Sequence, residues 1–312
     1  MNVKKLFVIF LLLFIPMMGN AEEPTDDADE PTSDIEEPAD DTEKSTGSDE
    51  EPPIIKFRNL LTFKSSLQYN FMIFEQSSKE YGFQTNRPWD FGIGLGIRNL
   101  FLGFSFSIPF LYDRHYQKSQ SFDGTFNHYN SRNKHYSSGY FRYYSGFHSV
   151  DNEVDLTILS MGISREYLFN RNHSIRSAYN LDGRQTVSNG SFLLGGGLFF
   201  TAIRSDSDSL SDYRKQNVFS FGPNAGYSYT WVIADHFFIN ASPVLGLNCL
   251  VSDRNFSAGF QALPKFSFGY HGKTWSANIY SNFSLSLGGY NTESEYYLLS
   301  GNIGISFLKR FL

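Results

Sequence analysis

The sequence contains one cysteine, Cys249, and after its first twenty residues it has no long apolar run. A single cysteine excludes an intramolecular disulfide framework. Without a run of about 20 apolar residues, no α-helix of the body can span a bilayer. No helical period of comparable length competes with the strand periodicity described below. These absences leave two classes for the body of the chain: a soluble all-β domain or a membrane-spanning β-barrel.

The first 21 residues have the order of a secretory signal peptide. A basic start with Lys4 and Lys5 precedes an apolar run that ends at Met18, and Gly19-Asn20-Ala21 supplies small residues for cleavage. The apolar run is too short to cross a bilayer as a helix. No cysteine lies directly after this run, at the position of a lipid attachment site, which argues against a lipid-anchored lipoprotein. We therefore predict export, with residues 1–21 removed after Ala21.

Residues 22–53 form an acidic segment that contains proline and almost nothing apolar. From Glu22 to Glu51 there are fifteen Asp and Glu residues and one Lys, whereas residues 52–312 have seventeen acids and twenty-three Lys and Arg. Such a segment cannot bury enough surface to offset its ordering entropy, so we expect a disordered linker. It is either a solvated spacer or an arm that contacts a basic periplasmic partner or the barrel mouth. The modest basic charge of the body does not imply a nucleic-acid partner.

Alternation of bulky and small residues dominates residues 54–312. In "FGIGLGI", Phe91, Ile93 and Leu95 are separated by glycines, and this period of two is the strand period. A soluble sheet would place charged or polar residues, not glycine, on its second face. With 32 Phe and 19 Tyr in the chain, the pattern instead favours a transmembrane antiparallel β-barrel, with the bulky face in lipid and the small face lining a narrow polar interior.

The alternation predicts about twelve strands, with both ends of the barrel at the periplasmic rim. Two features conflict with this count: the tight turn at 170–173 falls on the outer rim, and 122–129 is a candidate thirteenth strand. Four prolines interrupt apolar faces, each at the cost of a ladder hydrogen bond unless a bulge absorbs it: Pro109, Pro223, Pro243 and Pro264. The predicted strands are 57–74, 89–98, 100–110, 134–146, 155–169, 173–182, 189–203, 217–231, 236–249, 256–270, 273–287 and 296–309.

The last predicted strand ends "SGNIGISFLKRFL" and resembles the C-terminal strand by which outer-membrane barrels are handed to their assembly machinery. It differs in ending with Leu312, so that the aromatic Phe311 is penultimate. The expected location is the outer membrane of a Gram-negative bacterium. Expected partners are outer-membrane lipids and the barrel-assembly machinery.

Residues 167–203, "YLFNRNHSIRSAYNLDGRQTVSNGSFLLGGGLFFTAI", resemble the central block of a domain-of-unknown-function family, number 4421, of predicted Bacteroidetes-type outer-membrane β-barrels. The matching features are Phe169-Asn170, Arg184-Gln185 and the run from Gly190 to Gly195, and residues 226–246 fit the same family. The resemblance covers most of residues 56–312. It implies a barrel fold and an outer-membrane location, and it implies no reaction.

No motif for catalysis, a metal or a cofactor stands out, and we expect none of the three. His115, His128, His135 and His148 gather in and around the longest predicted loop, but their spacing matches no ligand signature. Charges within strand patterns cost about 2–4 kcal/mol on the lipid face at mid-bilayer, so we expect them to point inward. The lumen-lining candidates are Lys64, Arg98, Arg142, Arg165, Glu166, Arg176, Asp182 and Lys265.

Three functions remain open from the sequence. The first is a narrow pore or a passive membrane or assembly component, with mild anion preference if the basic lumen is open. The second is a surface enzyme that modifies lipid or lipopolysaccharide through loop residues between His115 and His148. The third is a scaffold whose acidic segment recruits a basic periplasmic partner.

Overall fold

A computed structural model describes residues 52–57, 61–76, 79–85, 88–108, 110–111, 120–130, 134–149, 155–205, 215–252, 255–289 and 295–311. Residues 1–51 lie outside this part of the chain. The signal peptide and most of the acidic linker fall there, so both stay predictions. Among the described residues, no helix is long and apolar enough to cross a membrane.

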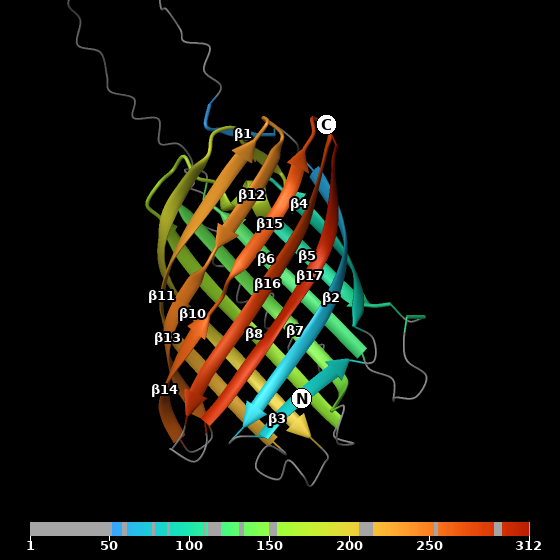
Figure 1. The fold of residues 1–312 in the computed structure, drawn as a ribbon, viewed down its shortest axis with the longest axis vertical. Coiled ribbons are helices and arrows are strands. Elements are labelled where there is room, and N and C mark those ends of the chain that lie inside the picture. The colour runs from blue at the N-terminus through green and yellow to red at the C-terminus, as the bar shows by residue number, and fades with distance from the viewer. Residues whose placement is uncertain are drawn as a thin grey trace, which may run out of the picture. The chain divides into compact units, whose positions relative to one another are not determined.

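The described strands close into an antiparallel β-barrel (Figure 1), as the alternation predicts. Twelve strands of the described chain form the ring when two interrupted strands are each counted once. The final strand pairs with β2, and β10 pairs with β11, which completes the circle. In chain order the ring contains β2 (Leu61–Gln76), β4 (Trp89–Ile97), β5 (Leu100–Ser107), β6 (Gln120–Tyr129), β7 (His135–Ser149), β8 (Asp155–Leu168), β10 (Asn189–Ser205), β11 (Lys215–Ile233), β12 with β13 (Phe237–Ser242, Val244–Ser252), β14 with β15 (Asn255–Ala262, Lys265–His271), β16 (Trp275–Gly289) and β17 (Glu295–Phe311).

Four short elements lie outside the ring. At one end, β3 (Lys79–Thr85) pairs with β2 and β7. At the other end, β1 (Ile54–Lys56) pairs with β9 (Gly183–Gln185), and α2 (Ile175–Tyr179) precedes β9.

The predicted number of strands is right because two errors cancel. Residues 173–182 are not a strand: they contain α2, whose Ile175 and Ala178 are buried at helical spacing. Residues 122–129, treated as a doubtful extra strand, belong to β6, which pairs with β5 and β7 along its length. With β6 in place, the segment after β8 lies at the opposite end of the barrel, so the turn at 170–173 no longer falls on the rim that was expected to carry long loops.

The start of the first ring strand and the end of the last ring strand lie at the same rim, which we call the terminal rim. Strand β2 begins there and β17 ends there, and Leu61 pairs with Phe311. Tight turns between strands lie at this rim, including Arg98-Asn99 and Ala234-Asp235. Arg98, Ala234 and Asp235 have positive φ angles of 53°, 47° and 62°. Positive φ suits two-residue hairpins, whose twist then matches that of the strands.

The two faces of the strands are inverted relative to a soluble protein. Large apolar side chains face outward, with Leu247 at 68% and Phe192 at 67% exposure, whereas Asn240 and Ser276 are fully buried. Aromatic pairs occur on the outer face near the terminal rim, where the ring centroids of Tyr270 and Trp275 lie 5.0 Å apart. An apolar outer band with aromatic residues at its edge is the surface expected of a membrane barrel.

The prolines and glycines explain local departures from regular strands. Pro243 and Pro264 lie at the two strand interruptions, because proline cannot donate to the ladder. Pro223 stays within β11, opposite Gly196, and Pro109 is outside the described residues. Gly94 makes room in the lumen: a Cβ there would come within 2.4 Å of the Phe101 ring. The glycine face therefore serves packing inside the barrel.

Candidate functional site: a plugged lumen

Residues 169–188, which we call the plug, connect β8 to β10 at the terminal rim. Within the plug, the Ser174 hydroxyl accepts a hydrogen bond of 3.2 Å from the backbone N–H of Ser177 and so caps α2. The Gln185 side chain accepts from the backbone N–H of Ser174 at 3.0 Å. Leu181 ends the helix with a φ of 64° and is fully buried. Left-handed residues commonly terminate helices in this way.

Lumen-facing side chains from several strands hold the plug by its backbone carbonyls. Lys64 on β2 donates to the Tyr179 carbonyl at 2.7 Å. Ser267 on β15 and Asn278 on β16 both donate to the Ala178 carbonyl, at 2.8 and 3.1 Å. Helix C-termini leave such carbonyls without intrahelical partners. The barrel wall therefore supplies the capping groups that a five-residue helix cannot provide for itself.

An ion pair fixes the side of the plug nearest the β4–β5 turn. Arg176 Nε lies 2.8 Å from Asp182 Oδ1, and the Arg176 guanidinium also donates to Asn99 at 3.0 Å and to the Arg98 carbonyl. Burial by itself lowers the pKa of Arg176, but the adjacent Asp182 carboxylate more than offsets it, so this pKa is raised. Arg176 is therefore a permanent cation at this contact.

His173 links the plug to the barrel wall as a buried, neutral imidazole. Its Nδ1 lies 3.1 Å from the Asn189 carbonyl oxygen and its Nε2 lies 2.8 Å from the Ser228 hydroxyl on β11. Burial lowers the pKa of His173 to about 4, although the hydrogen bond to the Asn189 carbonyl works in the opposite direction. Protonation of this ring below neutral pH would place an additional charge inside the plug.

The N-terminal residues 52–57, which we call the latch, lie against the plug. Ile54, Ile55 and Lys56 pair with Gln185, Arg184 and Gly183. Thr186 adds two hydrogen bonds, from its N–H to the Pro53 carbonyl at 3.1 Å and from its hydroxyl to the Pro52 carbonyl at 2.7 Å. The end of the latch is covered by Arg310, whose guanidinium carbon lies 3.7 Å from the Phe57 ring centroid.

Three neighbouring cavities, which share lining residues, follow one another from the plug into the barrel. Their volumes are about 220, 110 and 120 Å³, and Arg142 lines all three. Their order along the barrel follows from β16, which contributes Tyr280 and Asn282 to the first, Ser284 to the second and third, and Ser286 to the third alone. Tyr179 and Asn180 of the plug line the first cavity. The chain of cavities thus runs from the plug toward the opposite rim.

Acidic side chains also lie inside the barrel. Asp90 is fully buried and accepts hydrogen bonds from Asn70 at 2.8 Å and Ser121 at 2.7 Å. Asp123 is 4% exposed and accepts from the Tyr144 hydroxyl at 2.7 Å. Sequence reasoning missed both, although Asp90 has the parity of the glycine face and Asp123 lies in the doubtful strand. They reduce the basic excess from which anion preference was expected.

The expected lumen residues are distributed over three locations. Lys64, Arg142, Glu166 and Lys265 line the internal cavities, and Arg176 and Asp182 pair within the plug. Arg165 is exposed between two buried neighbours, so its inward placement was wrong: successive strand residues point to opposite faces, and Glu166 takes the inward position. Arg98 is also exposed, in the β4–β5 turn rather than in the lumen.

The Domain of unknown function (DUF4421) family model matches residues 55–307. The chain belongs to this family. No curated protein matches the sequence. Solved structures that match include OmpT of Vibrio cholerae, with 8% identity, 82% of this chain and 100% of that chain covered, and a TM-score of 0.34. The toluene transporter TodX of Pseudomonas putida matches with 7% identity, coverages of 80% and 89%, and a TM-score of 0.27.

The strand β6 separates the histidines that were predicted to gather in one loop. His128 lies on β6 opposite Leu100, and His135 begins β7 at the terminal rim. His148 lies near the far end of β7, thirteen residues from His135 and so about 40 Å away at 3.3 Å per residue. His115 is outside the described residues. Within the described part of the chain, no group of three His, Cys, Asp or Glu residues is placed to hold a metal ion.

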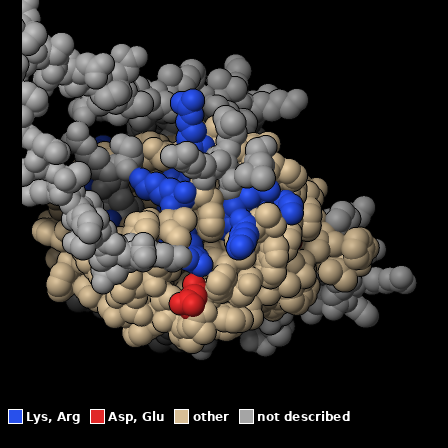
Figure 2. Space-filling view, turned by 90° about the horizontal axis from the view of Figure 1, so that it is seen from above, with Lys and Arg blue, Asp and Glu red and all other residues tan. Residues whose placement is uncertain are grey.

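The terminal rim is basic. Figure 2, which looks down on this rim, shows Lys and Arg side chains gathered on it. The turns, strand ends and plug at this rim contain the following Lys and Arg residues: Arg98, Lys134, Arg171, Arg184, Lys273 and Lys309. Such a rim is suited to lipid phosphates or other anions beside the barrel mouth.

Proposed function

We propose that this protein is an outer-membrane barrel that acts as a narrow conduit, closed at its terminal rim by the plug. The outer-membrane location is supported by the apolar outer face, the closed ring and the buried polar residues, because only a closed barrel satisfies every strand edge in lipid. By the layout of such barrels, the rim with the termini and the tight turns faces the periplasm.

The observation that carries this proposal is the chain of cavities that ends at the plug. A barrel of eight strands is filled by side chains, whereas sixteen or more leave a channel, and twelve strands lie between these cases. Here the space beyond the plug is not filled: cavities that share Arg142 follow one another along the axis. The plug itself, not the strand number, accounts for closure at the terminal rim.

The nature of the plug contacts supports release rather than permanent closure. The plug is joined to the wall by side-chain hydrogen bonds, and among the described residues its only strand pairing is with the three residues of β1 in the latch. A single hydrogen bond contributes about 0.5–1.5 kcal/mol net. Several such bonds together hold the plug against the wall, and each one can break and form again. The preceding acidic segment is covalently connected to the latch at Pro52.

The decisive experiment is planar-bilayer conductance of the mature chain and of a variant with a shortened plug. In the variant, residues 171–187 are replaced by a short Asn-Gly turn that joins β8 directly to β10. These two strands are already paired up to Leu168 of β8, whose partner on β10 is Leu193. The intact chain should be closed for most of the recording, and the variant should conduct in steady steps. The outward-facing Arg165→Gln variant is the control and should behave as the intact chain.

Heat-modifiable electrophoretic mobility establishes that each protein has formed its barrel. If the shortened variant folds by this criterion and is as silent as the intact chain, the conduit proposal is wrong. The barrel would then be a sealed structural component of the membrane.

A further inference from the structure

The cavity farthest from the plug has an apolar wall inside a lumen that is otherwise polar. Ile158, Ile203 and Leu250 are 5%, 7% and 4% exposed and line this cavity together with Phe199. Their strand parity places them inward, beside Ser160, Thr201 and Asn248. A water-filled channel is lined by polar groups, so four large apolar residues in the lining of this cavity indicate a different occupant.

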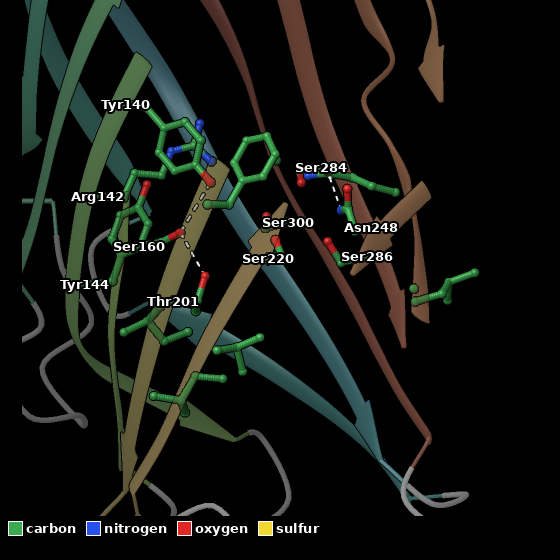
Figure 3. A pocket seen from close by; sticks show the side chains of 18 of the residues that line it. Tyr140, Arg142, Tyr144, Ser160, Thr201, Ser220, Asn248, Ser284, Ser286 and Ser300 are labelled. Carbon is green, nitrogen blue, oxygen red and sulfur yellow. Dashed lines mark hydrogen bonds between the residues drawn. The ribbon is translucent and has the colours of Figure 1, made fainter. Parts of the chain in front are cut away.

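The same wall of the cavity also supplies hydroxyl groups in a row, since Ser160 and Thr201 pair with each other two residues along β8 and β10 from Ile158 and Ile203. The Ser160 hydroxyl lies 3.1 Å from that of Thr201 and 3.4 Å from that of Tyr140, on three adjacent strands (Figure 3). Further hydroxyls line the cavity from β11, β16 and β17: Ser220, Ser284, Ser286 and Ser300. The lining can therefore contact an apolar body and also offer hydrogen bonds to a polar group of the same ligand.

A cation with an unused donor stands at the junction of the three cavities. Arg142 Nε is buried and has no hydrogen-bond partner among the described residues. Its guanidinium lies 4.9 Å from the Tyr140 ring centroid, and Asp123 faces it across the β6–β7 pair. Arg142 Nε and Asp123 Oδ1 do not hydrogen-bond to each other, and Asp123 Oδ1 is also buried without a hydrogen-bond partner among the described residues. An unpaired buried donor on a cation is costly unless a ligand or water completes it.

We infer that this cavity binds a small apolar carboxylate, with its carboxylate on Arg142 and its apolar body against Ile158, Ile203 and Leu250. The volume of about 120 Å³ is close to that of the engineered apolar cavity of about 150 Å³ that accepts benzene. Arginine suits this role because its planar fork matches a carboxylate. The Tyr140–Ser160–Thr201 row offers hydrogen bonds to the second carboxylate oxygen.

This binding site goes beyond the proposed conduit, because equilibrium binding requires no flow through the barrel. The site would stand if the barrel never opened at the plug. Conversely, a conducting barrel without carboxylate binding would retain the conduit and lose the site.

The test is isothermal titration of the full mature chain in lipid nanodiscs with benzoate and with hexanoate. Benzyl alcohol lacks the charge and acetate lacks the apolar body, so both serve as comparison ligands. Saturable binding of benzoate or hexanoate, with weaker binding of both comparison ligands, is expected. The acid that binds more tightly then shows whether the cavity prefers a ring or an alkyl chain as the apolar body.

Two variants assign the binding to this cavity. Arg142→Gln removes the charged donor and should weaken acid binding by about tenfold to a hundredfold, with little effect on benzyl alcohol. Ser220→Phe fills the cavity from β11 and should abolish binding of the acids. Arg165→Gln removes the same charge from the outer face of β8 and should leave binding unchanged.

Two results would overturn the inference. One is the absence of saturable acid binding at millimolar concentration to a barrel that passes the electrophoretic folding test. The other is undiminished binding by the Arg142→Gln variant, which would place the acid elsewhere, on the basic rim or in the lipid.

Discussion

The guanidinium of Arg310 donates a hydrogen bond of 2.6 Å to the carbonyl oxygen of Leu181. The same guanidinium donates to the Gly272 carbonyl at 2.9 Å and to the Ser276 hydroxyl, and it lies over the Phe57 ring. One side chain on the final strand therefore joins the end of α2, a turn of the wall and the latch. We therefore expect Arg310 to contribute strongly to holding the plug in place.

Replacement of Arg310 by Met is expected to loosen the plug. The variant leaves the Leu181 and Gly272 carbonyls without their charged donor, and hydrogen bonds to charged groups contribute about 1.5–3 kcal/mol each. The open probability in planar bilayers should rise at least tenfold. Lys309→Met, on the outward-facing neighbour, is the matched control and should leave the plug closed. Equal behaviour of the two variants would contradict this role.

Disruption of the latch should have a similar but smaller effect. Ile55 lies in the middle of β1 opposite Arg184, and proline there cannot donate to the ladder. Ile55→Pro is therefore expected to increase protease access to residues 183–188 and to raise conductance moderately. Ile55→Ala keeps the backbone donor and is the control. Unchanged protection of the plug in Ile55→Pro would show that β1 does not hold it.

Acid should weaken the plug through His173. Burial lowers the pKa of this residue from 6.5 to about 4, so the released plug binds more protons than the docked plug between these two values. The docking contribution is complete above about pH 6.5 and is lost as the pH falls toward 4, by about 3 kcal/mol at most. Conductance measured from neutral pH downward should therefore rise over this interval.

The His173→Gln variant provides the control for the acid effect. Glutamine retains a hydrogen-bonding side chain without a titration in this range, so its conductance should change less across the same interval. The variant also keeps the Arg176–Asp182 pair. Any pH dependence of conductance that remains in the variant therefore comes from groups other than His173. A full acid response in His173→Gln would assign the effect elsewhere.

The glycines of the lumen face should differ sharply in their tolerance of alanine. A Cβ at Gly94 would lie 2.4 Å from the Phe101 ring, whereas at Gly246 the nearest atom would be 3.4 Å away. Gly94→Ala is expected to reduce the free energy of unfolding by about 1–3 kcal/mol, and Gly246→Ala to have little effect. Denaturant unfolding followed by electrophoretic mobility measures both.

A second substitution tests whether Phe101 causes the cost at Gly94. Phe101→Ala removes the ring that alanine at position 94 would strike. In the double variant, Gly94→Ala should therefore cost less than it does alone, since neighbouring substitutions that share a contact are not additive. Full additivity would mean that the glycine is required for its backbone and not for the space.

The charged residues inside the barrel show which inward positions can be predicted from strand parity alone. Parity places Asp90 with Gly92 and Gly94 on the small face, so its burial was available from the sequence. Parity also forbids Arg165 and Glu166 from both facing inward, and the structure resolves that conflict in favour of Glu166. Arg176 and Asp182 were both expected in the lumen, and the structure pairs them, six residues apart, within the plug.

The period of two over most of residues 54–312 predicted an antiparallel barrel with its apolar face outward, because strand parity assigns each residue to one face. The placement of residues 169–188 against the inner face of the wall came from the tertiary structure. The reason is that the plug is held by residues remote in sequence: Lys64 lies 115 positions from Tyr179, and Arg310 lies 129 positions from Leu181. Which lumen residues meet depends on the register of every intervening strand, and no local pattern contains that information.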